Sequence, residues 1–173
     1  MGNRLIDFIK DNLDKDWDWE WLSENPSIKM EDIESNSLLP WDWLYISSNP
    51  NITMEFVNKN LDKDWNWCWL SLNSSIKMED IVSNPLLPWN WYYISDNPNI
   101  TIDFVKKNLD KPWDWNSLSR NYGIKMEDIE SNPSLPWNWS YISLNQNITI
   151  AFVKRNLDKD WDWELLSYNS GMR

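Results

Sequence analysis

Pairs of neighbouring carboxylates are the groups in this sequence best suited to chemistry. Glu31-Asp32, Glu79-Asp80 and Glu127-Asp128 each follow an Ile-Lys-Met segment. Paired carboxylates can act as general acid and base, or can bind Ca²⁺. A calcium loop needs further ligands at regular spacing, and the flanking residues do not supply them. We therefore expect these acids to lie in the first turn of a helix, where negative charge favours the helix N-terminus.

Other reactive residue types are scarce. The chain has no histidine, which excludes Ser-His-Asp and Cys-His pairs and His-ligated zinc. Cys68 is the only cysteine, so neither an internal disulfide nor a Cys₄ cluster can form. The sequence does not combine a nucleophile, a base and an orienting group. It therefore predicts a protein that is not an enzyme and that has no cofactor and no metal site.

Several asparagines match the N-glycosylation sequence. Asn51, Asn99 and Asn147 begin Asn-Ile-Thr triplets, and Asn73 begins Asn-Ser-Ser. The segment MGNRLIDFIKDN lacks the apolar core of a signal peptide, so we expect an intracellular protein that is not secreted. The triplets then have a structural reading, in which Thr caps a helix and Asn completes a turn.

These residues recur because the chain is a tandem repeat. A Trp-x-Trp pair starts every 24 residues, at Trp17, Trp41, Trp65, Trp89, Trp113, Trp137 and Trp161. With the first Trp as position 1, the unit reads W-x-W-x-x-[L/I]-S-x-N-x-x-I-[K/T]-[M/I]-x-x-[I/V]-x-x-N. Units starting at 17, 65 and 113 contain IKMEDI, whereas those starting at 41, 89 and 137 contain Phe-Val followed by NLDK. Because the two kinds of unit alternate, we expect the duplicated block to be 48 residues long. We expect one repeat domain over 1–173, with partial units at 1–16 and 161–173.

Each unit is predicted to form two short helices, A and B. Helix A is expected to start at the first Trp and to end at the position-9 Asn in a left-handed conformation. Its expected N-terminal residues are an Asp N-cap (Asp16, Asp64, Asp160) or a proline at the first helical position (Pro40, Pro88, Pro112, Pro136). Helix B is expected to start after a Thr cap (Thr53, Thr101, Thr149) and to close at the position-20 Asn.

Helices this short need packing from their neighbours. At helical spacing, positions 3, 6 and 7 should face helix B, while position 1 should contact the neighbouring unit. The recurrent Asn columns could bind a ligand, although such columns more often tie one repeat to the next. The predicted fold class is all-α, an α-solenoid of 24-residue repeats.

A leucine-rich repeat is the main alternative, since it has a similar length and an Asn after an apolar pattern. That motif needs apolar residues five before and two after its Asn. Here these positions are mostly polar, as Glu20, Asn116 and Ser27 illustrate. The α-solenoid is therefore favoured.

Two sets of residues are candidates for an interaction surface. Position 5 is aromatic at Trp21, Tyr45, Trp69, Tyr93 and Tyr141. These rings either pack between units or form an exposed ledge that grips a peptide or a sugar. Positions 18 and 19 carry cations, at Lys59, Lys106, Lys107, Lys154 and Arg155, and acids at Glu34 and Glu130. Stacked units would then show alternating charged stripes, which are either a solvated face or a means of selecting a partner.

Charge and hydropathy exclude two classes of partner. Asp and Glu number 27 against 16 Lys and Arg, a formal charge of −11, whereas nucleic acid requires a cationic surface. No apolar run approaches the roughly 18 residues of a membrane span. We expect neither a nucleic-acid nor a membrane partner.

The phrases WNWYYISDNPNITIDFVKKNLDKPWDW and WLYISSNPNITMEFVNKNLDKDWNW resemble tandem Trp-rich repeats of giant, mimivirus-like DNA viruses, over essentially the whole chain. This resemblance implies a viral origin, with the protein in the host cytoplasm or in the virion, and brings no established activity. The unit is also similar in length and punctuation to the bacterial leucine-rich-variant repeat, a two-helix element. The iron–sulfur attachment of that family needs cysteines that this chain lacks.

The function predicted from these observations is that of a non-enzymatic repeat scaffold for protein–protein interaction, acting on a host or viral protein. The alternative is a structural virion component that self-associates through the open half-repeats. A carbohydrate binder that uses the position-5 aromatics is a third hypothesis.

Overall fold

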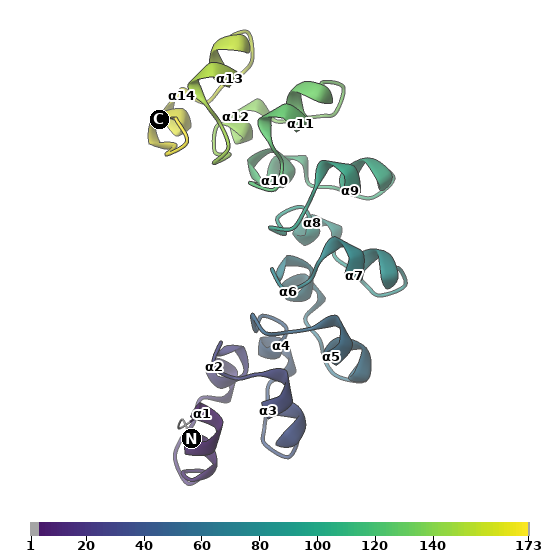
Figure 1. Cartoon of the computed structure of the whole chain (residues 1–173), viewed down its shortest axis with the longest axis vertical. Coiled ribbons are helices and arrows are strands. Elements are labelled where there is room, and N and C mark those ends of the chain that lie inside the picture. The colour runs from purple at the N-terminus through teal and green to yellow at the C-terminus, as the bar shows by residue number, and fades with distance from the viewer. Residues whose placement is uncertain (1–3, 173) are drawn as a thin grey trace. The chain divides into compact units, whose positions relative to one another are not determined.

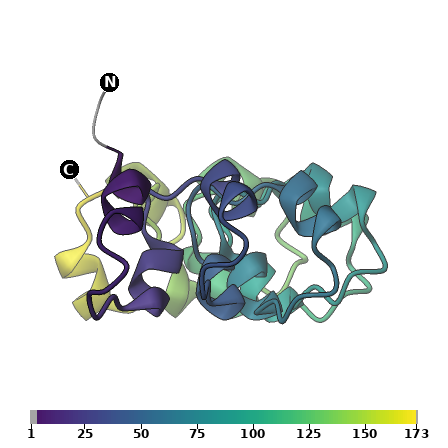
Figure 2. The same cartoon turned by 90° about the horizontal axis from the view of Figure 1, so that it is seen from below.

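The computed structural model describes residues 4–172, in which all regular structure is helical (Figures 1 and 2). The predicted all-α array of 24-residue repeats is confirmed. The helices of this range are α1 (Leu5–Lys10), α2 (Trp19–Glu24), α3 (Met30–Ser35), α4 (Trp43–Ile46), α5 (Met54–Lys59), α6 (Trp67–Leu72), α7 (Met78–Ser83), α8 (Trp91–Ile94), α9 (Ile102–Lys107), α10 (Trp115–Arg120), α11 (Met126–Ser131), α12 (Trp139–Ile142), α13 (Ile150–Arg155) and α14 (Trp163–Tyr168).

The chain divides into two compact units, one ending at Trp89 and one beginning at Asn90. In the first unit, the A helices α2, α4 and α6 form one row and the B helices α3, α5 and α7 a second row (Figure 1). In the second unit, α8, α10, α12 and α14 are A helices, and α9, α11 and α13 are B helices. Neighbouring A helices contact each other directly, as α2 does α4 and α10 does α12.

Helix A starts two residues later than predicted. Its N-cap is the Asp or Asn at position 2, whose side chain accepts a backbone N–H, as Asp18 does from Trp21 at 3.1 Å. The predicted N-caps (Asp16, Asp64, Asp160) and prolines (Pro40, Pro88, Pro112, Pro136) therefore lie outside the helix. The first Trp of each pair precedes the helix. Its indole N–H donates to the backbone carbonyl of the position-20 Asn, which lies five residues earlier, and in Trp41 this bond to Asn36 is 3.0 Å long.

Helix B begins as predicted in the units that contain Thr. Thr53 accepts the N–H of Phe56 at 3.2 Å, and Thr101 and Thr149 do the same for Phe104 and Phe152. In the other units the N-cap residue is a lysine without a side-chain cap bond, and the second carboxylate of the acid pair bonds in the reverse direction: Asp32, in the first turn, accepts the N–H of the N-cap Lys29 at 2.9 Å. Asp80 and Asp128 repeat that bond. The predicted first-turn role of the acid pairs is confirmed, and so is the closure of helix B at the position-20 Asn.

The position-9 asparagines form a ladder between repeats. The amide of Asn49 donates to the carbonyls of Ser23, Asn25 and Ile28 in the preceding repeat, at 2.8, 3.2 and 3.3 Å. Asn73, Asn121, Asn145 and Asn169 make equivalent bonds within their own compact units. The prediction that this column ties repeats together is confirmed.

The predicted left-handed conformation at position 9 is wrong. Asn25 has φ −64° and ψ 128°, and no residue of the range 4–172 has positive φ. The extended backbone allows the Asn side-chain oxygen to accept the N–H two residues later, which it does from Ser27 at 2.9 Å. The side-chain oxygen of the position-9 Asn thus forms the turn, whereas its side-chain NH₂ group bonds to the preceding repeat. The sequon residue Asn51 also donates to the preceding repeat, at 2.8 Å to Pro26, which confirms its structural role.

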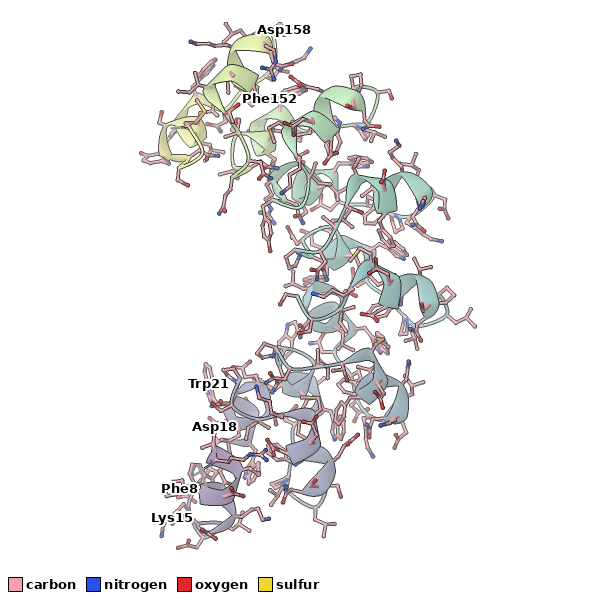
Figure 3. All side chains as sticks on the ribbon, viewed as in Figure 1. Phe8, Lys15, Asp18, Trp21, Phe152 and Asp158 are labelled. Carbon is pink, nitrogen blue, oxygen red and sulfur yellow. The ribbon has the colours of Figure 1, made fainter. Side chains whose placement is uncertain are left out.

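The paired tryptophans form a second ladder. The position-3 rings from Trp19 to Trp139 each meet the position-1 ring of the next repeat edge-on, with centroids 5.1–5.3 Å apart. In the Phe-containing units the position-3 ring also stacks on helix B, as Trp43 does on Phe56 at 5.8 Å. Figure 3 shows Phe152 on the side of α13 toward α12, where it stacks on Trp139. The predicted contact of position 1 with the neighbouring unit is therefore confirmed, although position 1 makes it from an extended segment, and the predicted contact of position 3 with helix B is confirmed in the Phe-containing units.

Position 7 behaves differently from the prediction that it faces helix B. Ser23 is fully buried, and its hydroxyl oxygen accepts the N–H of Asp42 in the next repeat at 2.9 Å. The hydroxyl of Ser47 accepts the N–H of Asn66 in the same way and donates to the Trp43 carbonyl at 2.9 Å. A serine is required here because the site needs one donor and one acceptor in a small side chain.

Candidate interaction surface

Positions 4, 5 and 8 of helix A do not belong to the constant part of the repeat. That constant part, which we call the repeat frame, consists of positions 1, 3, 6, 7, 9, 12 and 17, whose side chains are largely buried. Positions 4 and 8, and positions 5 and 8, are neighbours on a helix surface because they are four and three residues apart. We call these three positions the variable face. In the first compact unit it consists of Glu20, Trp21, Glu24, Leu44, Tyr45, Ser48, Cys68, Trp69 and Leu72.

The position-5 aromatics differ in exposure. Trp21 is 68% exposed and projects from the side of α2 away from α3 (Figure 3). Tyr45, Trp69, Tyr93 and Tyr141 are half-buried. Tyr45 and Trp69 meet edge-on with centroids 5.4 Å apart, so their rings pack between repeats. Packing between repeats is therefore shown for Tyr45 and Trp69, and Trp21 is an exposed ring.

Glu20 and Tyr45 form a polar contact on this face. The Glu20 carboxylate raises the pKa of Tyr45 above its ordinary value, through hydrogen bonding to the protonated hydroxyl and through its negative charge, and the charge of Asp42 acts in the same direction. A raised pKa in the folded state stabilises the fold below the ordinary pKa of about 10. This contribution is lost as the pH rises through the higher pKa of folded Tyr45.

Replacing Glu20 with glutamine is expected to lower the pKa of Tyr45, because the charge and the carboxylate acceptor are both removed. A spectrophotometric titration of tyrosinate, taken as the difference between each chain and its Tyr45→Phe variant, measures this pKa. Glu79→Gln, on α7, is the control and should leave the titration unchanged. An unchanged pKa in the Glu20→Gln variant would contradict the contact.

A groove of about 360 Å³ lies on the variable face of the first compact unit. It is lined by Glu24, Ser48, Pro50, Trp69, Leu72, Asn73 and Ser74. The Ser48 hydroxyl donates to Glu24 at 3.1 Å, and Leu72 is 39% exposed. The carboxylate of Glu24 thus lines the same groove as the indole ring of Trp69 and the exposed side chain of Leu72.

The candidate cations lie on helix B and not on the variable face. Lys106, Lys107 and Lys154 are exposed and form no ion pair with any residue of the range 4–172. Arg155 binds Glu130 of the preceding repeat at 2.8 Å, and Lys59 contacts Glu34 at 3.9 Å. Arg155 thus pairs between repeats, whereas Lys59 lies closer to Glu55 of its own helix, at 2.8 Å. The structure does not bring the cations together with the position-5 aromatics on one helix.

Sequence reasoning missed the exposed apolar residues at positions 4 and 8. Leu44 is 46%, Tyr92 56% and Leu144 40% exposed. It also missed Arg120, which binds Asp96 of the preceding repeat at 3.0 Å. The signal that could have found them is variation, because these positions change from unit to unit inside an otherwise constant pattern.

Within the described range, no group of three or more Cys, Asp or Glu side chains is arranged to hold a metal ion. No helix there has the length and apolar character needed to cross a membrane. Comparison of the chain with protein-family models, with curated proteins and with solved structures finds no match. The resemblance to viral Trp-rich repeats stays a prediction, and the geometry of the repeat is what bears on function.

Proposed function

We propose that this chain is a non-enzymatic scaffold that recognises another protein along the variable face of its A helices. One observation carries this proposal: a constant buried frame presents side chains that change from repeat to repeat. Stacked helical repeats offer extended surfaces of this kind. The resemblance to viral repeats adds that the partner would be a host or viral protein.

The exposed side chains have the chemistry of a protein interface. Trp21, Leu44 and Leu72 are 68%, 46% and 39% exposed, and they come from successive A helices. A single exposed apolar residue needs no explanation, but aligned aromatic and aliphatic residues are typical of binding surfaces. Carboxylates of Glu20 and Glu24 lie among them, which gives the face both apolar area and charge for specificity.

Affinity capture with two matched triple variants tests this proposal. The first combines Trp21→Ala, Leu44→Ala and Leu72→Ala, which removes the face. The second combines Leu38→Ala, Val82→Ala and Leu86→Ala, residues that are 100%, 63% and 97% exposed outside it. In lysate of the cells that make the chain, we expect a saturable partner that the first variant loses at least tenfold and the second retains. Equal loss from both variants would contradict a role for the face.

Self-assembly is the second candidate, and two exposed rings favour it. Phe8 is 56% exposed, whereas Phe56, Phe104 and Phe152 at the same repeat position are 3%, 7% and 0% exposed. Trp163 is 56% exposed, whereas the other position-3 tryptophans are half-buried. A contact between Phe8 of one copy and Trp163 of another would reproduce the stacking of Trp43 on Phe56.

Sedimentation velocity over a concentration series distinguishes the two candidates. Self-assembly requires association that Trp163→Ala and Phe8→Ala each weaken and Trp21→Ala does not. A chain that stays monomeric throughout the series rules out this contact and leaves the scaffold.

A further inference from the structure

We propose that the groove between Glu24 and Leu72 binds an arginine of the partner protein, with the guanidinium group on Glu24 and a neighbouring apolar residue on Trp69 and Leu72. This inference rests on the proposed scaffold function and names the chemistry of its partner: a segment in which arginine adjoins an apolar residue.

The groove provides both halves of such a site. Glu24 ends α2 and is half-buried, and Ser48 supplies the hydrogen bond that it receives at 3.1 Å. No lysine or arginine of the range 4–172 forms an ion pair with Glu24. On the other side of the groove, Trp69 and Leu72 of α6 present an aromatic ring and a partly exposed aliphatic chain.

The second compact unit contains an internal model of the occupied site. Asp96 holds position 8 there, as Glu24 does in the first unit, and the next position 8 is Arg120. The Arg120 guanidinium donates to both oxygens of Asp96, at 3.1 and 3.0 Å. At the equivalent place beside Glu24 the chain has Ser48. The repeat geometry thus brings a guanidinium onto a position-8 carboxylate, and in the first unit the chain itself does not supply one.

Charge complementarity indicates a cationic partner for this part of the face. The segments 17–24, 41–48 and 65–72 contain Asp18, Glu20, Glu24 and Asp42 and no lysine or arginine. Arginine suits the groove better than lysine, because its planar fork can bond a carboxylate twice and can stack on an indole. The groove volume of about 360 Å³ lies at the small end of ligand sites, which is adequate for one or two side chains.

The test uses two synthetic peptides, acetyl-Gly-Arg-Leu-Gly-amide and its citrulline analogue, in which the guanidinium group is replaced by a neutral urea of the same shape. Binding to the full chain is followed by NMR at the indole N–H of Trp69, assigned from the resonance that Trp69→Phe removes. We expect a saturable shift of this signal with the arginine peptide and at least tenfold weaker binding of the citrulline peptide. Equal binding of both peptides, or no shift at Trp69, overturns the proposal.

Three variants locate the site. Glu24→Gln should weaken the arginine peptide about tenfold, while Glu79→Gln, which removes one exposed carboxylate from α7, should change binding less than twofold. Ser48→Arg should place a guanidinium group on Glu24, as Arg120 does on Asp96, and abolish peptide binding with the circular dichroism spectrum unchanged. Equal weakening by Glu24→Gln and Glu79→Gln would show a general charge effect and overturn the site.

Failure of this inference is separable from failure of the scaffold function. If the peptides do not bind but the triple variant of Trp21, Leu44 and Leu72 still loses a captured protein, the groove proposal falls and the scaffold stands. If neither triple variant affects capture but the arginine peptide shifts the Trp69 signal, the groove stands as an arginine site and the proposal of an extended binding face falls.

Discussion

Asn49→Ala is expected to lower the free energy of unfolding by about 2–4 kcal/mol. The Asn49 side chain is fully buried, and its amide donates to three carbonyls of the preceding repeat. Alanine removes the donor of the Ser23 carbonyl and the acceptor of the Asn51 N–H, whereas the Asn25 and Ile28 carbonyls keep their bonds from the Ile28 N–H and the Asn51 amide. Each buried group left unsatisfied costs about 1–3 kcal/mol, and the bonds share one side chain, so the losses do not add in full.

Two variants provide the controls for Asn49. Asn49→Asp keeps the shape and the acceptor oxygen but cannot donate, so it should be at least as destabilising as alanine. Asn58→Ala removes an exposed amide of α5 in the same compact unit and should cost less than about 0.5 kcal/mol. Denaturant unfolding monitored by circular dichroism measures all three. A loss below about 1 kcal/mol in Asn49→Ala would contradict the role of the Asn ladder.

Trp65→Ala should cost about 3–5 kcal/mol, in the range known for large-to-small changes in protein cores. The Trp65 ring is 7% exposed and touches Trp43 and Phe56 with centroids 5.2 and 6.1 Å away. Its indole N–H also donates to the Asn60 carbonyl at 2.8 Å. Alanine would remove the ring that joins two repeats and leave a cavity between them.

Phenylalanine at residue 65 separates packing from hydrogen bonding. Trp65→Phe keeps an aromatic ring but loses the bond to Asn60, so a loss of about 1–2 kcal/mol is expected. Trp21→Ala removes an equally large side chain that is 68% exposed and should change stability by less than about 0.5 kcal/mol. If Trp65→Ala and Trp21→Ala have equal effects in denaturant unfolding, the tryptophan ladder is not what holds the repeats together.

The repeat frame is largely predictable from sequence because its residues recur at a fixed interval. An Asn at every position 9 has a chemical reason only if each copy meets the same neighbour, which predicts a ladder. The same logic predicts the Thr caps and the contact between Trp pairs. Periodicity does not report backbone dihedral angles, however. That is why the left-handed conformation predicted for Asn25 proved wrong.

The start of helix A shows where local rules compete. Asp16 and Pro40 suit a helix beginning at the first Trp, but the position-2 side chain of Asp18 or Asp42 can accept backbone N–H groups directly, and this cap determines the start. The position-1 indole then donates to a backbone carbonyl outside helix A. Helix propensities and capping rules do not predict this contact, because it involves no residue of helix A.

The candidate surface was predictable only in part. The position-5 aromatics were identified from sequence, but the division between the packed Tyr45 and the open Trp21 depends on the residue that each meets in the adjacent repeat. Pairing of Arg155 with Glu130 likewise depends on how far one helix B reaches toward another. The groove at Glu24 combines residues of three successive repeats, so its volume follows from packing and not from any one motif.

Photo-crosslinking from single positions tests the central claim, recognition by the variable face, most directly. A photo-reactive benzoylphenylalanine replaces either Leu44, on the face, or Leu38, which is fully exposed outside it. The account predicts that, in lysate of the cells that make the chain, residue 44 crosslinks to one defined protein and residue 38 does not. Crosslinking of that protein from both positions alike, or only of the chain to itself, would contradict it.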